Sequence, residues 1–259
     1  MVAPDARRLC DSKGMAFDVT VLGCGEAFDE QYTNTSLLAR VEDKTILIDC
    51  GYSAPAPFWN AVPDADAVDL IYISHEHADH CFGLPAVLGR MWEDGRTKPL
   101  VILSQPPVLV RVGELMEAGY PRLSARFQYA IEYREAAPGQ HVTWEGLGFD
   151  FAPTRHSVSN LAIRVAASGK KFCYSGDGEF TDESRALFAG AELLIHEAYS
   201  FDPSPIHGDF PGMIQMAAEQ NVSQLALVHI SRKVRREQGE RIRKVDAVIP
   251  EPGDRLALC

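Results

Sequence analysis

Residues 68–80 read Val68-Asp-Leu-Ile-Tyr-Ile-Ser-His-Glu-His-Ala-Asp-His80, an apolar run followed at once by a cluster of imidazole and carboxylate groups. The apolar part predicts a strand that is buried on both faces. Residues two apart in an extended segment point to the same side, so His75 and His77 share one side. We expect a turn to bring Asp79 and His80 back to it. Because imidazole and carboxylate together suit Zn, Mn or Fe, the stretch predicts a metal site at the end of this strand.

Further candidate ligands follow other apolar strands in the sequence. They are His156 after Phe149–Ala152, Asp177 after Lys171–Tyr174, and His229 after Leu225–Val228. Taken singly, each has a structural explanation, such as a turn aspartate between glycines or a hydrogen-bonded core histidine. Taken with the first cluster, they indicate one ligand set held at several strand ends, where a rigid element meets an open cleft.

The rest of the chain alternates between strand and helix patterns. Hairpins are predicted over Leu37–Val41 with Thr45–Ile48 and over Leu161–Val165 with Lys171–Tyr174. Further strands are predicted over Phe17–Leu22, Leu100–Leu103, Phe127–Glu132, His141–Trp144, Phe149–Ala152, Leu193–Ile195, Leu225–Val228, Ala247–Ile249 and Arg255–Leu258. Helices are predicted over Leu84–Trp92, Pro107–Ala118, Asp182–Phe188, Met213–Glu219 and Lys233–Val245. The layered solution is two packed sheets with helices outside, in a single α/β domain over residues 1–259.

Composition narrows the class of protein. The chain has 259 residues, 46% of them hydrophobic and 24% charged, which excludes disorder, collagen and coiled coil as its main state. Its net charge of −11 argues against an open surface for nucleic acid or anionic membrane. No signal peptide or membrane-length apolar run is visible, and the six cysteines show no C-x-x-C spacing. We therefore expect a cytoplasmic protein with free, buried thiols and a poorly ordered segment at residues 1–13.

The series His75-x-His77-x-Asp79-His80, His156, Asp177 and His229 resembles the metallo-β-lactamase superfamily. The resemblance implies an αβ/βα four-layer sandwich with a binuclear metal site between the sheets. It implies that His75, His77 and His156 hold one ion, that Asp79, His80 and His229 hold the other, and that Asp177 bridges them. It also implies two divalent metal ions as cofactors, zinc first, with manganese or iron as alternatives. The zinc β-lactamases have a cysteine where this chain has Asp177, which argues against β-lactamase activity.

A later motif indicates which branch of the superfamily the chain resembles. Leu193-Leu-Ile-His-Glu-Ala-Tyr199 is similar to the His-Glu-Ala-Thr motif of ribonuclease Z, and His207 precedes His229 by 22 residues, as in that family and a related cyclic phosphodiesterase. The resemblance implies that Glu197 orients His207 and that His207 acts as a general acid, with Asp79 as the third catalytic residue. The tRNA-binding arm of ribonuclease Z is missing, because only 21 residues separate His156 from Asp177. Pre-tRNA is therefore a doubtful substrate, and a small or single-stranded phosphodiester is favoured.

Substrate-binding residues are predicted less directly. Arg232 and Lys233 follow His229 closely and are candidate binders of an anionic substrate, whereas the later basic residues read as a solvated helix face. Aromatic side chains in Tyr52–Pro63 and Tyr199–Pro211 either line the cleft or pack beneath the loops.

Three functions remain open on the sequence alone. The first is phosphodiester hydrolysis, supported by Glu197 and His207. The second is hydrolysis of a carboxylic ester, lactone or thioester, with Tyr199 polarising the carbonyl. The third is a metal-binding sensor without turnover, which a complete ligand set disfavours. A homodimer is plausible by family analogy, and no membrane partner is expected.

Overall fold

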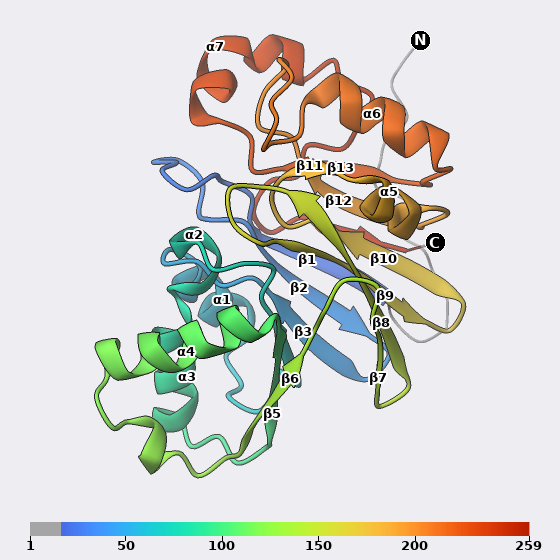
Figure 1. The fold of residues 1–259 in the computed structure, drawn as a ribbon. Coiled ribbons are helices and arrows are strands. Elements are labelled where there is room, and N and C mark those ends of the chain that lie inside the picture. Colours follow the sequence, from blue (N-terminus) through green and yellow to red (C-terminus); the bar gives the residue numbers. More distant parts are fainter. Residues whose placement is uncertain (1–16, 259) are drawn as a thin grey trace.

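The structure is a computed structural model that describes residues 17–258, and its chain runs through two facing sheets with helices on the outside of each (Figure 1). The expected poorly ordered segment at residues 1–13 lies outside the described residues. No described helix is long and apolar enough to cross a membrane.

The first sheet holds, within residues 17–258, seven strands in the order β14-β1-β2-β3-β4-β5-β6. The strands β14, β1, β2 and β3 pair in antiparallel fashion, and β3 to β6 pair in parallel. Their bounds are β1 Phe17–Gly23, β2 Ser36–Val41, β3 Lys44–Ile48, β4 Leu70–Tyr72, β5 Leu100–Ser104, β6 Ile131–Glu135 and β14 Arg255–Ala257.

The second sheet runs β11-β8-β9-β10-β12-β13, with β7 paired to β8. Its hairpin of β9 and β10 fills the interval between His156 and Asp177, as predicted. The bounds are β7 His141–Trp144, β8 Leu147–Arg155, β9 Leu161–Ala167, β10 Lys170–Tyr174, β11 Glu179–Phe180, β12 Leu193–Glu197 and β13 Leu225–Val228.

Helices cover the outer face of each sheet, which confirms the αβ/βα sandwich (Figure 1). Helices α1 Pro55–Ala61, α3 Leu84–Glu93 and α4 Pro106–Gly119 pack on the first sheet, and α5 Asp182–Phe188, α6 Phe210–Glu219 and α7 Arg232–Ile242 pack on the second. The short helix α2 Ala78–Cys81 follows β4, and the 3-10 turn η1 Ser124–Arg126 follows α4.

Alternation along each strand explains the continuous apolar runs in the sequence. In β2, Leu37 and Ala39 lie in the cluster between the sheets, whereas Leu38 lies in the cluster under the helices. In β4, Leu70 and Ile71 divide in the same way. Because both faces of these strands are buried, both sets of side chains must be apolar.

The clearest differences from the prediction concern four elements. The strand predicted over Phe127–Glu132 is wrong at its start, because parallel pairing with β5 sets it at Ile131–Glu135. Phe127 instead stacks on Tyr129, with ring centroids 4.8 Å apart. The predicted strand Ala247–Ile249 is reduced to one bridge between Val248 and Ala226.

The other two differences concern helices. The segment Tyr52–Pro63, read as a loop, contains α1, whose first turn carries a proline that needs no backbone hydrogen-bond partner. The helix predicted over Lys233–Val245 begins at Arg232 and ends at Ile242, with a kink where Gln238 has φ −125° and ψ 22°.

The cysteines that the structure describes are free and buried, as expected; they are Cys24, Cys50, Cys81 and Cys173. Burial raises the pKa of the Cys24, Cys81 and Cys173 thiols to about 12, so these cysteines are protonated packing residues.

Candidate metal centre

The predicted ligands meet where the carboxyl ends of several strands come together. His75 and His77 follow β4, His77 is the N-cap of α2, and Asp79 and His80 lie within α2. The remaining ligands follow strands of the second sheet, with His156 after β8, Asp177 after β10 and His229 after β13. All seven predicted ligands are thus brought together, in two groups that share Asp177.

The first group consists of three imidazoles and one carboxylate. His77 Nδ1 lies 3.1 Å from both His75 Nε2 and His156 Nε2. Asp177 Oδ2 lies 3.9 Å from His75 Nε2 and 3.8 Å from His156 Nε2. Ring nitrogens that converge on one point beside a carboxylate are the donor set that a divalent ion of the zinc type requires.

The second group is almost completely buried and consists of Asp79, His80, Asp177 and His229. His80 Nε2 lies 3.3 Å from Asp79 Oδ2 and 3.3 Å from Asp177 Oδ1. His229 Nε2 lies 3.2 Å from Asp79 Oδ2 and 3.3 Å from Asp177 Oδ2. Among the residues that the structure describes, His80 Nε2 and Asp177 Oδ1 are buried without a hydrogen-bond partner. Such atoms are costly to bury unless a cation satisfies them, so this group also fits a divalent ion.

The outer nitrogens of three of these imidazoles are held by the protein. Ser74 Oγ lies 3.0 Å from His75 Nδ1, and the Ile206 carbonyl lies 3.1 Å from His156 Nδ1. Asp49 Oδ2 lies 2.8 Å from His80 Nδ1. Contacts of this kind fix the tautomer and the ring orientation of a metal-binding histidine.

Asp49 is a supporting residue that sequence reasoning missed. It is fully buried and accepts hydrogen bonds from the Ser74 amide and hydroxyl, both at 2.8 Å, and from the Tyr174 hydroxyl at 2.9 Å. Its backbone has φ +56°, a conformation unusual for a residue other than glycine. The available signal was its place directly after the apolar strand Lys44–Ile48, the same position that identified the ligands.

Burial and charge act differently on the two groups. Burial, together with the neighbouring imidazoles, lowers the pKa of His75 well below its usual range. Burial alone would also lower the pKa of His80, but the carboxylates of Asp177 and Asp49 raise it well above that range. Burial likewise opposes the charge on His229, but the carboxylates of Asp177, Asp79 and Glu197 raise its pKa well above the usual range. The second group therefore carries the stronger negative field, which attracts a cation.

Glu197 and His207 form the predicted pair beside the first group. His207 Nδ1 lies 2.9 Å from Glu197 Oε1, which also accepts hydrogen bonds from the amides of Gly178 and Gly208. The His207 ring centroid is 5.2 Å from that of His156, and the ring stacks on Tyr199 at 4.6 Å. Burial would raise the pKa of Glu197, yet its hydrogen bond with His207 lowers it, and the carboxylate in turn raises the pKa of His207. Both shifts favour a proton on His207 beside an ionised Glu197, although burial opposes the charge on each side chain.

Of the two predicted substrate-binding residues, Arg232 is engaged elsewhere. Its Nη1 pairs with the buried Glu26 at 2.9 Å and donates to the Phe28 carbonyl at 3.2 Å. Lys233 is exposed on α7. The structure thus places Arg232 against the loop that follows β1.

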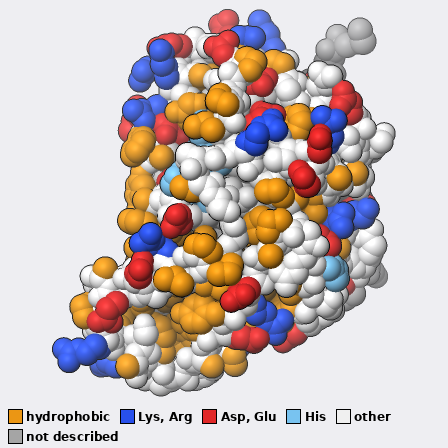
Figure 2. Space-filling model, in the orientation of Figure 1, with side chains coloured by type: hydrophobic (Ala, Val, Ile, Leu, Met, Phe, Trp, Pro, Cys, Tyr) orange, Lys and Arg blue, Asp and Glu red, His pale blue; other side chains and the backbone are white. Residues whose placement is uncertain are grey.

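The aromatic side chains near the site divide into packed and exposed ones. Phe58 and Trp59 on α1, Phe201 before α6 and Phe210 at the start of α6 are buried in the apolar clusters beneath the helices. Tyr52 is 49% exposed, and Phe28 and Phe82, which the sequence did not single out, are 73% and 46% exposed. Figure 2 shows histidine side chains reaching this face between α2 and the helices of the second sheet, with hydrophobic side chains nearby.

Comparison with known proteins agrees with this geometry. The family model described as Anti-Pycsar protein Apyc1 matches residues 17–247. An Anti-Pycsar protein Apyc1 from Paenibacillus sp. (strain J14) is 33% identical, covering 84% of this chain and 90% of that protein. A ribonuclease Z from Methanothermobacter thermautotrophicus is 27% identical, covering 85% of this chain and 88% of that protein. The metallo-β-lactamase fold protein YhfI from Bacillus subtilis superposes with a TM-score of 0.77 at 20% identity, covering 94% of this chain and all of that one.

These relatives and the donor set together identify a metal-dependent hydrolase related to ribonuclease Z, with the metallo-β-lactamase fold. The chain belongs to the Anti-Pycsar protein Apyc1 family.

Proposed function

We propose that this protein is a binuclear phosphodiesterase that hydrolyses a small or single-stranded phosphodiester, such as a cyclic nucleotide. The observation that carries the proposal is the 2.9 Å contact between Glu197 Oε1 and His207 Nδ1, beside two ligand groups that share Asp177. Departure of an alkoxide from phosphorus needs a proton, and a protonated imidazole held by a carboxylate supplies one near neutral pH.

The seven candidate ligands would bind two metal ions. His75, His77 and His156 would hold one ion, and Asp79, His80 and His229 the other, with Asp177 shared between them. Two divalent ions bound there, zinc by the donor set with manganese or iron as alternatives, would supply the acidity that ionises a water molecule and the positive charge that draws phosphate oxygens.

His207 acts on the leaving group. Its Nδ1 faces Glu197, so Nε2 is the atom left to donate a proton to the leaving oxygen. Glu197 keeps that imidazole protonated and oriented, and its Oε2 lies 3.3 Å from His229 Nδ1. A single carboxylate therefore positions both the proton donor and a candidate metal ligand, which couples the two parts of the site.

The segment between His156 and Asp177 bears on the size of the substrate. This interval holds only the hairpin β9–β10 and short connections, with no protruding arm. The exposed rings of Phe28, Tyr52 and Phe82 belong to segments that adjoin the ligands, and flat apolar groups of a small substrate can rest on such rings. Both features support a short phosphodiester rather than a folded RNA.

The test is a comparison of substrates across matched histidine variants. Metal-loaded wild type is assayed with bis(p-nitrophenyl) phosphate, a cyclic nucleotide, a lactone and a thioester. Because His207 gives the leaving oxygen its proton, His207→Ala is expected to lower phosphodiester turnover by about 10²- to 10⁴-fold, with the metal content unchanged. His141→Ala is the control, since His141 is exposed and, within residues 17–258, its ring contacts only Asp150 and Thr143 by hydrogen bonds.

Three outcomes would contradict the proposal or the role that it gives to His207. Turnover of the lactone or thioester that ignores His207, without phosphodiester activity, would favour a carboxylic ester hydrolase. Absence of turnover on all four substrates with both ions bound would favour a sensor. Loss of metal in His207→Ala would refute the role given to His207.

A further inference from the structure

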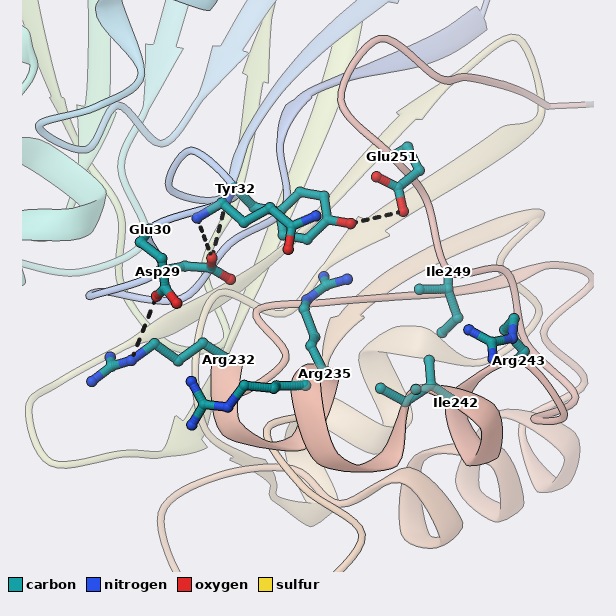
Figure 3. Close-up of a pocket in the computed structure, with 12 residues that line it drawn as sticks. Asp29, Glu30, Tyr32, Arg232, Arg235, Ile242, Arg243, Ile249 and Glu251 are labelled. Carbon is teal, nitrogen blue, oxygen red and sulfur yellow. Dashed lines mark hydrogen bonds and ion pairs between the residues drawn. The ribbon is translucent and has the colours of Figure 1, made fainter.

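A cavity of about 460 Å³ lies along one face of α7, apart from the metal centre. Its walls come from α7, from the loop after β1 and from the segment that precedes β14 (Figure 3). None of its lining residues is a candidate metal ligand or a member of the Glu197–His207 pair.

The spacing of residues along α7 directs several arginines into this cavity. The helix contributes residues three or four positions apart, namely Arg232, Arg235, Arg236, Gly239, Ile242 and Arg243. An α-helix turns once in about 3.6 residues, so the three arginines before the kink at Gln238 share one face, as do the three residues after it. Figure 3 shows Arg232 and Arg235 rising from α7 toward the loop that carries Tyr32.

Three of these arginines lack a carboxylate partner. Arg235, Arg236 and Arg243 form no ion pair with any residue between 17 and 258, whereas Arg232 is paired with Glu26. Arg235 Nη2 donates to the Cys24 carbonyl at 3.3 Å, and its guanidinium lies 4.4 Å from the Tyr32 ring centroid. Its Nε is buried, and no hydrogen-bond partner for it exists in the described part of the chain.

The charge at the start of α7 is unfavourable without an anion. Arg232, Lys233, Arg235 and Arg236 lie in the first two turns, where the helix dipole is positive. The first turn contains no acidic residue, and the N-cap Ser231 makes no side-chain hydrogen bond to it. The chain as a whole has a net charge of −11, so a group of cations at the N-terminal end of this helix is unusual. A bound anion there would offset their repulsion from the helix dipole.

The acidic residues of the cavity hold the loop after β1, although the buried Asp29 Oδ2 has no hydrogen-bond partner in the described part of the chain. Asp29 Oδ1 accepts hydrogen bonds from the amides of Gln31 at 2.8 Å and Tyr32 at 3.0 Å. Glu251 Oε1 accepts from the Tyr32 hydroxyl at 3.2 Å, as Figure 3 shows. Glu30 lies 3.8 Å from Arg232. These carboxylates hold the loop and Arg232, and none of them forms an ion pair with Arg235, Arg236 or Arg243 within residues 17–258.

We propose that this cavity binds a small organic phosphomonoester, with Arg235, Arg236 and Arg243 on the phosphate and with Ile242 and Ile249 against the organic part. Guanidinium groups match phosphate oxygens in pairs, and three of them around one cavity suit a dianion better than a carboxylate. The volume of about 460 Å³ exceeds what a lone phosphate fills and lies within the range of small-molecule sites. This site is independent of the reaction at the metal centre.

Isothermal titration calorimetry of the metal-loaded protein with ribose 5-phosphate tests the proposal. The comparison uses Gly239→Leu, which fills the cavity without changing its charge. A Cβ at Gly239 would meet only Arg243 Nη1, at 3.6 Å, so the helix accepts the substitution. We expect wild type to bind one more equivalent of ribose 5-phosphate than Gly239→Leu, whatever the metal centre itself binds.

A second pair of variants tests the role of charge. Arg243→Gln is expected to weaken the binding of the additional equivalent of ribose 5-phosphate by about tenfold, because a charge-assisted contact to phosphate is lost. Lys244→Gln removes the same charge at the next, also exposed, position outside the cavity, and is expected to leave the binding unchanged. Inorganic phosphate is expected to bind more weakly than ribose 5-phosphate.

Three results would overturn the proposal. Equal stoichiometry in wild type and Gly239→Leu would show that the cavity binds no phosphomonoester. Equal weakening of binding in Lys244→Gln and Arg243→Gln would show that the net charge of α7, and not a contact from Arg243, determines the affinity. Inorganic phosphate binding as tightly as ribose 5-phosphate would exclude contacts to an organic part.

Discussion

Asp177 is the one side chain that both candidate ligand groups share. It follows β10 in the turn Ser175-Gly-Asp-Gly178, and Gly176 has φ +62° with the Asn160 side chain 2.2 Å from the place of a Cβ. A larger residue at position 176 would displace Asn160, whose Oδ1 accepts from the Asp177 amide at 3.2 Å. The glycine is therefore needed to aim the carboxylate between the two groups.

Asp49→Asn is predicted to weaken metal binding by about 10- to 100-fold, because Asp49 holds His80 Nδ1 and so orients its other nitrogen. Chelator competition measures the affinity. Asp69→Asn is the matched control: Asp69 is also buried, but it accepts from the Thr45 amide and pairs with Lys98. Equal affinity in wild type and Asp49→Asn, or an equal loss in Asp69→Asn, would contradict the role of Asp49.

The pH dependence of turnover is predicted from the Glu197–His207 contact. The carboxylate raises the pKa of His207 above 6.5, so the proton donor is present below that pKa and is lost as the pH rises through it. Turnover should therefore fall on the alkaline side, and Glu197→Gln should move this fall to lower pH. The measurement is kcat against pH for both proteins. A fall at the same pH, or at higher pH, in Glu197→Gln would disprove the coupling.

The predictability of the site differs from residue to residue. His75, His156 and His229 are visible in the sequence because each stands directly after an apolar strand. Asp49 also follows a strand, but its contacts reach Ser74 and Tyr174, which are 25 and 125 positions away. Only the folded chain shows such long-range contacts.

At the scale of elements, the site depends on close packing between the end of β3 and α2. A Cβ on Gly51 would lie 2.0 Å from the Asp79 carbonyl oxygen, and one on Gly83 would lie 2.3 Å from that of Gly51. Glycine at these positions lets two backbones touch, which sets the place of the Asp79 and His80 side chains. The Cys50 amide donates to the His80 carbonyl at 2.7 Å across the same contact.

Gly51→Ala is predicted to lower the free energy of unfolding by about 1–3 kcal/mol and to reduce metal content, because the backbone of Asp79 must move. Urea denaturation and metal analysis measure the two effects. Gly113→Ala on α4 is the control, since no atom lies within 4 Å of its Cβ position, and it should stabilise by up to about 1 kcal/mol. Unchanged stability and metal content in Gly51→Ala would refute this packing argument.

Local pattern predicts elements well where packing agrees with it. The hairpins β2–β3 and β9–β10 were predicted because short turns separate two apolar runs. The predicted start of β6 is wrong because Phe127 and Tyr129 pack in the apolar cluster under the helices and do not belong to the strand. The segment Ala247–Ile249 lies at the sheet edge and forms one bridge, which periodicity cannot distinguish from a strand.

At the scale of the whole molecule, the two sheets supply different parts of the site. The first sheet and α2 provide His75, His77, Asp79 and His80, and the second sheet provides His156, Asp177, Glu197 and His229. The apolar cluster between the sheets, including Tyr72, Phe151 and Tyr174, holds the two halves of the site in register. The Tyr72 hydroxyl donates to the Leu161 carbonyl at 2.7 Å across this interface.

The most direct test of a binuclear site is the metal content of reconstituted protein, measured by mass spectrometry beside turnover of bis(p-nitrophenyl) phosphate. We predict two ions per chain in wild type. Because Asp177 is shared by both groups, Asp177→Ala should lose at least one ion together with turnover, while the chain stays folded. A single ion in fully active wild type, or full metal content and turnover in Asp177→Ala, would contradict the assignment of Asp177 as the bridge of a two-metal hydrolase.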